Sequence, residues 1–219
     1  MLTGVPNYPA GQIFKGYNFW GPSCEEYQGI KIFRVPQIPR GQKKPWQLVL
    51  NYVSFALSAS ILGPLWCKGK FDHIFVAQYS PVLVGLPGII LKKIKKAPLF
   101  FWVQDLWPES LSATNAVQSR FVLTGVKKLV RFIYKHCDYI LVQSRGFVEQ
   151  VKAMGVAIEK IYYFPNWAEE LYKPMSVPEN VAGLPKLPSG FKVMFAGNIG
   201  AAQDFETILT ATEKLKIHP

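Results

Sequence analysis

The side chains best suited to chemistry follow an unbroken apolar run. The five apolar residues Leu99–Val103 lead directly into Gln104 and Asp105, and Glu109 follows shortly after. A continuous apolar run of this length is typical of a parallel strand that is covered on both faces. In open α/β sheets, ligands bind outside the carboxyl ends of such strands. Asp105 is therefore the first candidate for a catalytic carboxylate. The alternative is that it caps the next turn while Trp107 simply packs.

A glycine turn near the end of the chain is the second place where chemistry is expected. Gly197, Asn198 and Gly200 lie between a predicted strand at 191–196 and a predicted helix at 203–217. Glycines at such a turn let backbone amides approach a phosphate, and the amino end of a helix favours negative charge. The alternative is that the two glycines only make the bend.

The segments between these two places alternate between strands and helices. Strands are predicted at 30–35, 71–78, 99–103, 138–144 and 161–166, and helices at 81–91, 120–136 and 145–154. This alternation predicts an α/β fold with a doubly wound, mainly parallel, Rossmann-like sheet. Residues 5–29 are rich in glycine, proline and aromatic side chains, and we expect a loop there whose preceding strand has been cut away.

A stretch of 22 residues, 46–67, carries no charge and has lysines on both sides. Its length alone would let it cross a membrane. Gln47, Asn51, Ser54 and Ser58 recur at steps of four, three and four residues, which places one polar stripe along an otherwise apolar helix. We therefore expect this helix to pack in the core or lie in a membrane interface rather than span the bilayer.

The composition indicates a folded domain with an anionic partner. The 219 residues are 49% hydrophobic and 14% aromatic, which excludes a disordered chain. Lysine and arginine number 25 against 14 acidic residues, so the formal charge is +11. The basic residues flank apolar helices and match no nucleic-acid-binding module, which favours an anionic membrane surface over nucleic acid. A solvated face remains the plainer explanation for any single basic cluster.

The cysteines and histidines point to no metal site. The three cysteines and three histidines are widely spaced, without a disulfide or metal-ligand pattern. This usage fits a reducing compartment, so a cytoplasmic protein is expected.

A proline-rich stretch divides the chain. Residues 173–190 contain four prolines and little apolar periodicity, which indicates a linker. The predicted organisation is a first domain at 1–172, the linker at 173–190, and the first strand and helix of a second domain at 191–219. Asp105 and Ser144 would then face the glycine turn across a two-lobed cleft.

Three motifs carry a resemblance to a known family: Val103–Ser110, Phe164–Trp167 and Phe195–Asp204. They resemble family 4 glycosyltransferases of the GT-B fold. The likeness is strongest to bacterial sugar transferases of capsule, O-antigen and colanic-acid assembly, including those that handle L-fucosamine-type sugars. The resemblance implies transfer of a sugar from a nucleotide donor, such as a UDP-sugar, with retention of anomeric configuration and without a metal or other cofactor. The implied acceptor is a sugar on a polyprenyl diphosphate, and the protein would be peripheral at the inner face of the cell membrane.

The same resemblance gives individual residues their expected roles. The 197–200 turn matches the loop beside the donor diphosphate, and its amides would stabilise the departing nucleotide. Asp105 matches the acceptor-domain residue that faces the reacting sugar, where it could orient a hydroxyl. Gln104 stands where many members have histidine, so the role of that histidine is not carried over. The candidates for the acceptor cleft are Asn7, Gln104, Glu109, Ser144 and Asn166.

Two features of the family are missing from this sequence. Members begin with a strand and a glycine-containing turn about 30 residues before Met1, judged from the usual domain length. They also place a Glu-(seven residues)-Glu pair and further donor contacts beyond Pro219. We therefore interpret the chain as a transferase fragment, truncated at both ends, and predict that the isolated chain does not turn over a nucleotide sugar.

Two other functions are possible on the sequence alone. A non-catalytic, membrane-associated or partner-binding remnant would bind lipid without binding nucleotide. A nucleotide-sugar epimerase or another Rossmann enzyme is disfavoured, because no Gly-x-Gly-x-x-Gly motif follows an early strand.

Overall fold

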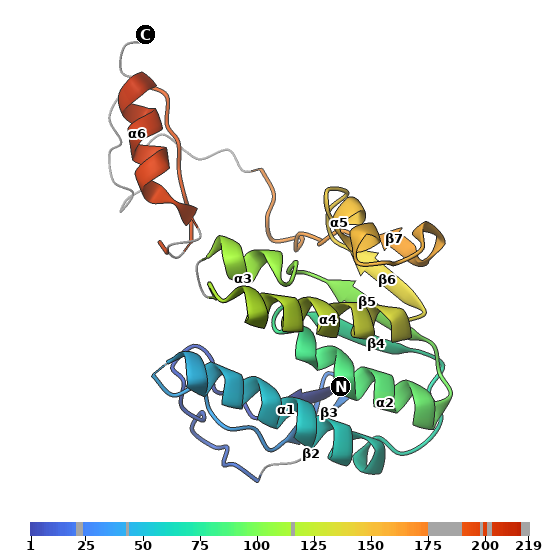
Figure 1. Ribbon diagram of the computed structural model, residues 1–219. Coiled ribbons are helices and arrows are strands. Elements are labelled where there is room, and N and C mark those ends of the chain that lie inside the picture. Colours follow the sequence, from blue (N-terminus) through green and yellow to red (C-terminus); the bar gives the residue numbers. More distant parts are fainter. Residues whose placement is uncertain are drawn as a thin grey trace. The chain divides into compact units, whose positions relative to one another are not determined.

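The computed structural model contains two compact units, Met1–Pro165 and Asn166–Pro219 (Figure 1). It describes residues 1–20, 24–42, 44–114, 117–174, 190–197, 199–200 and 203–215. The predicted domain limits at 172 and 190 stay a prediction, because most of the linker, 175–189, lies outside the described residues.

The larger sheet of the first unit has four parallel strands. Its two central strands are β5 (Leu99–Val103) and β6 (Tyr139–Val142). β4 (Ile74–Gln78) pairs with β5, and β7 (Ile161–Tyr163) pairs with β6. All four lie within the segments that the apolar runs predicted. The α/β class with a parallel, Rossmann-like sheet is confirmed.

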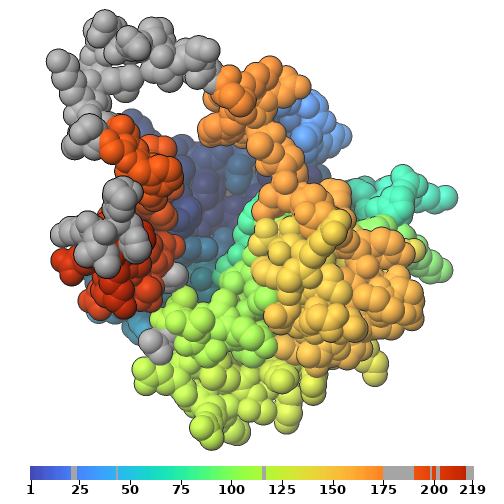
Figure 2. All heavy atoms as spheres, turned by 90° about the horizontal axis from the view of Figure 1, so that it is seen from above, coloured from blue at the N-terminus to red at the C-terminus, as the bar shows by residue number. Residues whose placement is uncertain are grey.

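Helices cover one face of this sheet and enclose the main core. Helices α2 (Gly85–Lys95) and α4 (Arg120–His136) lie side by side over it (Figure 1), and α5 (Phe147–Ala153) follows β6. Burying one large apolar side chain stabilises the fold by about 1.5–3 kcal/mol. The core side chains that are wholly buried include Val82, Leu99, Phe101, Val103, Val130, Ile133, Ile140, Val142 and Val151. The atoms of the sheet and its helices, green to yellow in Figure 2, form one continuous mass.

Two glycines allow α2 to approach the sheet this closely. A Cβ atom at Gly88 would lie 2.8 Å from the Val76 side chain, and one at Gly85 would lie 2.5 Å from the Ile133 side chain. Both distances are shorter than a Cβ contact tolerates, so any larger residue would push the helix outward. The absence of a side chain therefore sets the spacing between α2 and β4 at Gly88, and the spacing between α2 and α4 at Gly85.

A second, smaller sheet forms from the first 35 residues. Its central strand, β3 (Ile30–Val35), is parallel to β1 (Leu2–Gly4) and antiparallel to β2 (Cys24–Tyr27). The expectation of a loop throughout 5–29 was therefore wrong for β2, and the expectation that the strand preceding this stretch had been cut away was also wrong, because β1 lies directly before it. Gln28 and Gly29 both have positive φ and form the two-residue turn of a β-hairpin, so β2 is specified by its pairing rather than by apolar alternation.

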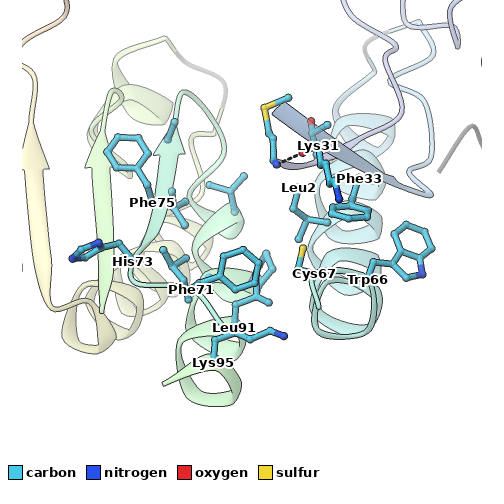
Figure 3. Close-up of a pocket in the computed structure, with 18 of the residues that line it drawn as sticks. Leu2, Lys31, Phe33, Trp66, Cys67, Phe71, His73, Phe75, Leu91 and Lys95 are labelled. Atoms are coloured by element: carbon cyan, nitrogen blue, oxygen red, sulfur yellow. Dashed lines mark hydrogen bonds between the residues drawn. The ribbon is translucent and has the colours of Figure 1, made fainter. Parts of the chain in front are cut away.

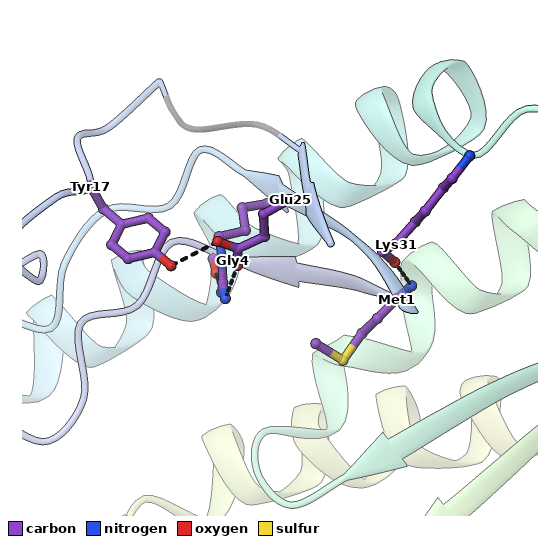
Figure 4. Close-up of polar contacts among 6 residues, drawn as sticks. Met1, Gly4, Tyr17, Glu25 and Lys31 are labelled. Carbon is purple, nitrogen blue, oxygen red and sulfur yellow. Dashed lines mark hydrogen bonds and ion pairs between the residues drawn. The ribbon is translucent and has the colours of Figure 1, made fainter. Parts of the chain in front are cut away.

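Polar contacts tie the three short strands together (Figure 4). Glu25 on β2 forms an ion pair with Arg34 on β3 and accepts a hydrogen bond from the Tyr17 hydroxyl at 2.9 Å. Arg34 also donates to the carbonyl of Gly4 on β1 at 3.4 Å. The hydrogen bond from Tyr17 and the charge and hydrogen bond of Arg34 outweigh desolvation, so the pKa of Glu25 lies below its usual value.

The long uncharged segment forms helix α1 (Pro45–Trp66), as predicted. Pro64 lies inside the last turn and does not end the helix. α1 packs beside α2, which places it on the same side of the first unit as the helices of the larger sheet (Figure 1). Among the described residues, α1 is the one helix long and apolar enough to cross a membrane by length and composition, and 22% of its most apolar window is buried.

The second unit has one helix among its described residues, α6 (Phe205–Leu215), where the sequence predicted one. The strand predicted at 191–196 was wrong, because those residues form no strand pairing. Phe191 is 97% exposed and Val193 is 87% exposed. An extended segment becomes a strand only when a neighbour accepts its backbone hydrogen bonds, and no described residue does so here.

Candidate functional site

Polar side chains gather at the carboxyl edge of the four-stranded sheet. Gln78 ends β4, Gln104 and Asp105 follow β5, and Gln143 and Ser144 follow β6. The strands end in register, so these residues leave the sheet at one edge. Backbone and side-chain contacts link them: the Gln104 amide donates to the Gln78 carbonyl at 3.2 Å, and Gln143 Nε2 donates to the Gln104 carbonyl at 3.4 Å. The structure therefore brings Gln104, Asp105 and Ser144 to a common edge.

Asp105 is held by its neighbours and does not cap a helix. Its Oδ2 accepts a hydrogen bond from Trp107 Nε1 at 3.0 Å, and its backbone carbonyl accepts one from Gln78 Nε2 at 3.0 Å. The next helix, α3 (Glu109–Ala113), begins after Pro108 without a side-chain cap. The buried Trp107 ring therefore fixes the direction of the half-buried carboxylate.

Gln78 is a residue of this edge that the sequence analysis missed. Its side chain is fully buried, and Oε1 has no hydrogen-bond partner in the described part of the chain. Burying an unpartnered acceptor costs about 1–3 kcal/mol, so such groups are rare unless a ligand or water uses them. The available signal was its position, because Gln78 is the polar residue at the end of the predicted strand 71–78.

The turn after β6 adds the positive charge of Arg145 to the same edge. Ser144 orders the turn after β6: its Oγ accepts from the Gly146 amide at 3.3 Å, and its carbonyl accepts from the Phe147 amide at 3.0 Å. The adjacent Arg145 is exposed, and its guanidinium lies over the Tyr163 ring, 5.3 Å from the ring centroid. A guanidinium steadied on an aromatic face keeps its donors available for a phosphate or carboxylate.

Two other predicted acceptor residues have different surroundings. Glu109 is exposed in the first turn of α3. Asn7 is buried, donates to the Val5 carbonyl at 2.9 Å, and accepts from the Arg40 amide at 3.2 Å and from Asn51 Nδ2 at 3.5 Å. These contacts give Asn7 a structural place between its own loop and α1. Its role in an acceptor cleft stays a prediction.

The predicted donor residues belong to the second unit. Asn198 lies outside the described residues, Gly197 is exposed, and the Gly200 amide donates to Gln203 Oε1 at 3.1 Å. Asn166 is also exposed and belongs to the same unit. The structure describes this unit by itself, so the expected phosphate role of the glycine turn stays a prediction.

The buried thiol offers little nucleophilic chemistry. All three cysteines are free, with Cys24 exposed and Cys137 buried. Burial raises the pKa of Cys137 to about 12, so this thiol stays protonated at neutral pH. The described part of the chain also holds no group of three or more His, Cys, Asp or Glu side chains placed to bind a metal ion.

A cavity of about 880 Å³ lies between the two sheets of the first unit. Figure 3 shows Leu2 and Phe33 of the small sheet on one side of this cavity, and Phe75 of β4 and Leu91 of α2 on the other. Among the described strands, β1 pairs only with β3 and β4 pairs only with β5, so both are edge strands lining the cavity. Its lining contains no predicted site residue, and it is therefore separate from the polar edge at Asp105.

The sequence of this chain matches a known protein family and two curated relatives. Residues 6–167 match the family model described as "Glycosyl transferase 4-like domain". Over 227 residues the chain is 25% identical to "Putative colanic acid biosynthesis glycosyl transferase WcaI" of Escherichia coli (strain K12), covering 100% of this chain and 55% of that protein. Over 190 residues it is 22% identical to "Probable glycosyltransferase WbjE" of Pseudomonas aeruginosa, covering 85% of this chain and 46% of that protein. The chain thus spans about half the length of the curated relatives that it matches. Because the family model covers most of the chain, including the strands that present Gln78, Asp105 and Ser144, the chain belongs to the glycosyl transferase 4-like domain family.

Proposed function

We propose that this chain forms the acceptor-side domain of a retaining glycosyltransferase for a bacterial surface polysaccharide. The observation that carries the proposal is the polar edge of the parallel sheet, where Gln78, Asp105 and Arg145 lie at the ends of three neighbouring strands. Ligands of open α/β sheets bind at such an edge. The family match and the printed name of the E. coli relative, which refers to colanic acid biosynthesis, support the reaction class and the pathway type.

Asp105 is proposed to orient the acceptor hydroxyl that attacks the anomeric carbon. As the new glycosidic bond forms, the bond from the sugar to the nucleotide diphosphate breaks, the diphosphate leaves with the electron pair, and its oxygen takes up the hydroxyl proton. The hydrogen bond from Trp107 keeps the carboxylate in one orientation, which is what positioning a hydroxyl requires. Gln104, Glu109 and Ser144 would line the acceptor side of the same cleft.

The donor is proposed to be a UDP-sugar. Its sugar is proposed to be of the L-fucosamine type. Amides of the Gly197, Asn198 and Gly200 turn would stabilise the charge on the departing diphosphate, a role in which backbone donors replace a metal ion. The acceptor is proposed to be a sugar on a polyprenyl diphosphate at the inner membrane face. Arg145 is suited to a phosphate of such a substrate, because its guanidinium is exposed and supported by Tyr163.

The complete transferase is proposed to place one more strand between β1 and β4. Both are edge strands, both line the 880 Å³ cavity, and apolar side chains such as Leu2, Phe33 and Val76 face it. A strand of five residues is about 17 Å long and would satisfy the backbone groups of both edges.

The test is an activity assay of the complete transferase with a radiolabelled UDP-sugar and a lipid-linked acceptor. We expect Asp105→Asn to lower kcat/KM by at least about 100-fold, because an amide cannot orient the hydroxyl as a carboxylate does. The matched control is Glu149→Gln, an exposed acid on α5 whose partner is Lys152. Wild-type rates for Asp105→Asn would refute the role of Asp105. Turnover by the isolated 219-residue chain would refute the prediction that this chain alone is inactive.

A second candidate function is a non-catalytic, membrane-associated remnant. The observation that favours it is the apolar outer face of α1, because this face could bind a membrane without any donor site. Titration of the complete transferase with UDP and UDP-sugars separates the two: nucleotide binding supports the transferase, and lipid binding without nucleotide binding supports the remnant.

A further inference from the structure

Helix α1 has the reverse of the pattern expected for a helix that faces water. Every exposed residue of Pro45–Trp66 is apolar. By contrast, its polar side chains at 47, 51, 54 and 58 are buried or half-buried. A surface helix of a soluble domain normally turns its polar side outward. The exposed stripe recurs at steps of three or four and is made by Trp46, Val49, Val53, Leu57, Ile61 and Leu65.

Hydrogen bonds hold α1 in this orientation. Asn51 is fully buried and donates through Nδ2 to the Ile38 carbonyl at 2.6 Å. The Ile38 amide donates to Ser54 Oγ at 3.0 Å, and Gln37 Nε2 donates to the Asn51 carbonyl at 3.3 Å. The helix cannot rotate to bury its apolar stripe without breaking these bonds. It also cannot cross a bilayer with this polar face attached to the domain, because such contacts would enter the hydrocarbon.

Positive charge surrounds the apolar stripe. Lys44 is exposed at the amino end of α1, and Lys68 and Lys70 are exposed just beyond its carboxyl end. Lys93 and Lys96 are exposed at the end of the neighbouring helix α2, which packs beside α1 (Figure 1). An apolar stripe with lysines at both ends, on a chain of net charge +11, is complementary to a surface with an apolar interior and anionic head groups.

We propose that α1 lies in the plane of an anionic bilayer. Its outer stripe enters the boundary between head groups and acyl chains along about 33 Å of helix, and the lysines at its ends contact lipid phosphates. Its inner, polar face remains bonded to the domain. This inference rests on the side chains of α1 and its neighbours alone, so it stands or falls independently of the catalytic proposal.

The test is vesicle flotation of the 219-residue chain, without donor or acceptor. Vesicles of phosphatidylcholine alone are compared with vesicles that also contain phosphatidylglycerol. The test variant is Leu57→Asp with Ile61→Asp, two residues that are 60% and 64% exposed, so the charges enter no packed core. The control is Ile158→Asp, which puts the same charge on a 55% exposed apolar side chain away from α1. Circular dichroism establishes that each variant is folded.

We expect the wild-type chain and the Ile158→Asp control to float with anionic vesicles. We expect the α1 variant to bind at least about tenfold more weakly, and high salt to weaken the wild-type binding. Sodium carbonate should release the bound chain. Flotation of the α1 variant equal to wild type would overturn the proposal, and so would resistance to carbonate, which indicates a membrane span. If α1 instead joins two copies, the wild-type chain will be a dimer that does not float and the variant a monomer, which would also overturn it.

Discussion

Replacing Gln78 with methionine tests whether the buried amide at the strand edge serves stability or function. Methionine has a similar length and no strong hydrogen-bonding groups, so the core space stays filled. The substitution removes the hydrogen bond from Nε2 to the Asp105 carbonyl, with a net value of about 1 kcal/mol. It also removes the unpartnered Oε1, whose burial costs about 1–3 kcal/mol. The free energy of unfolding should therefore be unchanged or rise by up to about 2 kcal/mol.

Urea unfolding followed by tryptophan fluorescence measures this difference in free energy. Gln78→Ala is the matched control, because it removes the same polar groups but leaves a cavity, and it should be destabilised by about 2 kcal/mol or more. In the complete transferase, Gln78→Met should lower kcat/KM by at least about tenfold, which corresponds to about 1.4 kcal/mol. Activity should fall because the Asp105 backbone loses its side-chain hydrogen bond to β4, although the backbone bond from the Gln104 amide to the Gln78 carbonyl remains.

The opposite results would refute this reasoning. A loss of stability greater than about 2 kcal/mol in Gln78→Met would mean that Oε1 is satisfied in the folded protein and contributes to its stability. Unchanged activity in the complete enzyme would mean that the polar edge around Gln78 does not take part in catalysis.

Three further predictions test the packing and burial of other residues in the first unit. Asp138→Asn should lower the free energy of unfolding at neutral pH by about 1–2 kcal/mol, because the carboxylate pairs with Lys92 at 2.7 Å and accepts a backbone hydrogen bond from β5. Burial raises the pKa of Asp138, but these hydrogen bonds and the Lys92 charge together hold it below its usual value. The extra stability of the wild type over Asp138→Asn should therefore be present above about pH 4 and disappear as the pH falls further. Urea titrations at several pH values measure this difference. Gly88→Val should cost about 1–3 kcal/mol in thermal unfolding, since its Cβ would lie 2.8 Å from a β4 side chain; an unchanged melting temperature would contradict this packing. Iodoacetamide should label Cys24 in the folded chain and Cys137 only after unfolding, as measured by mass spectrometry, and equal labelling rates would contradict the buried, protonated state of Cys137.

The local pattern of the sequence was enough to place the larger sheet and its helices. Leu99–Val103 forms β5 at the bounds that its apolar run indicated, and 120–136 forms α4 at the predicted bounds. The start of α4 is encoded locally, because Ser119 accepts a hydrogen bond from the Val122 amide. The carboxyl edge followed from the same pattern, since parallel strands of similar length end together.

Predictions failed where an element depends on a partner that the local sequence does not specify. The strand β2 reads Cys-Glu-Glu-Tyr and has no apolar alternation, yet it forms because a hairpin turn returns it to β3. Residues 191–196 have the apolar character of a strand and form none, because no described neighbour pairs with them. The burial of Gln78 likewise depends on the pairing of β4 with β5, not on its own identity.

The sequence by itself determined the strands and helices of the larger sheet, most of the polar residues that leave its strands, and the uncharged helix with its polar stripe. Those properties depend on the spacing of side chains along one segment, which the sequence states directly. Only the tertiary structure decided which way each face turns. It directs the polar stripe of α1 inward and its apolar side outward, and it joins Asp105 to Gln78 and Trp107. Orientation depends on contacts between segments distant in the sequence, and the folded arrangement alone determines those contacts.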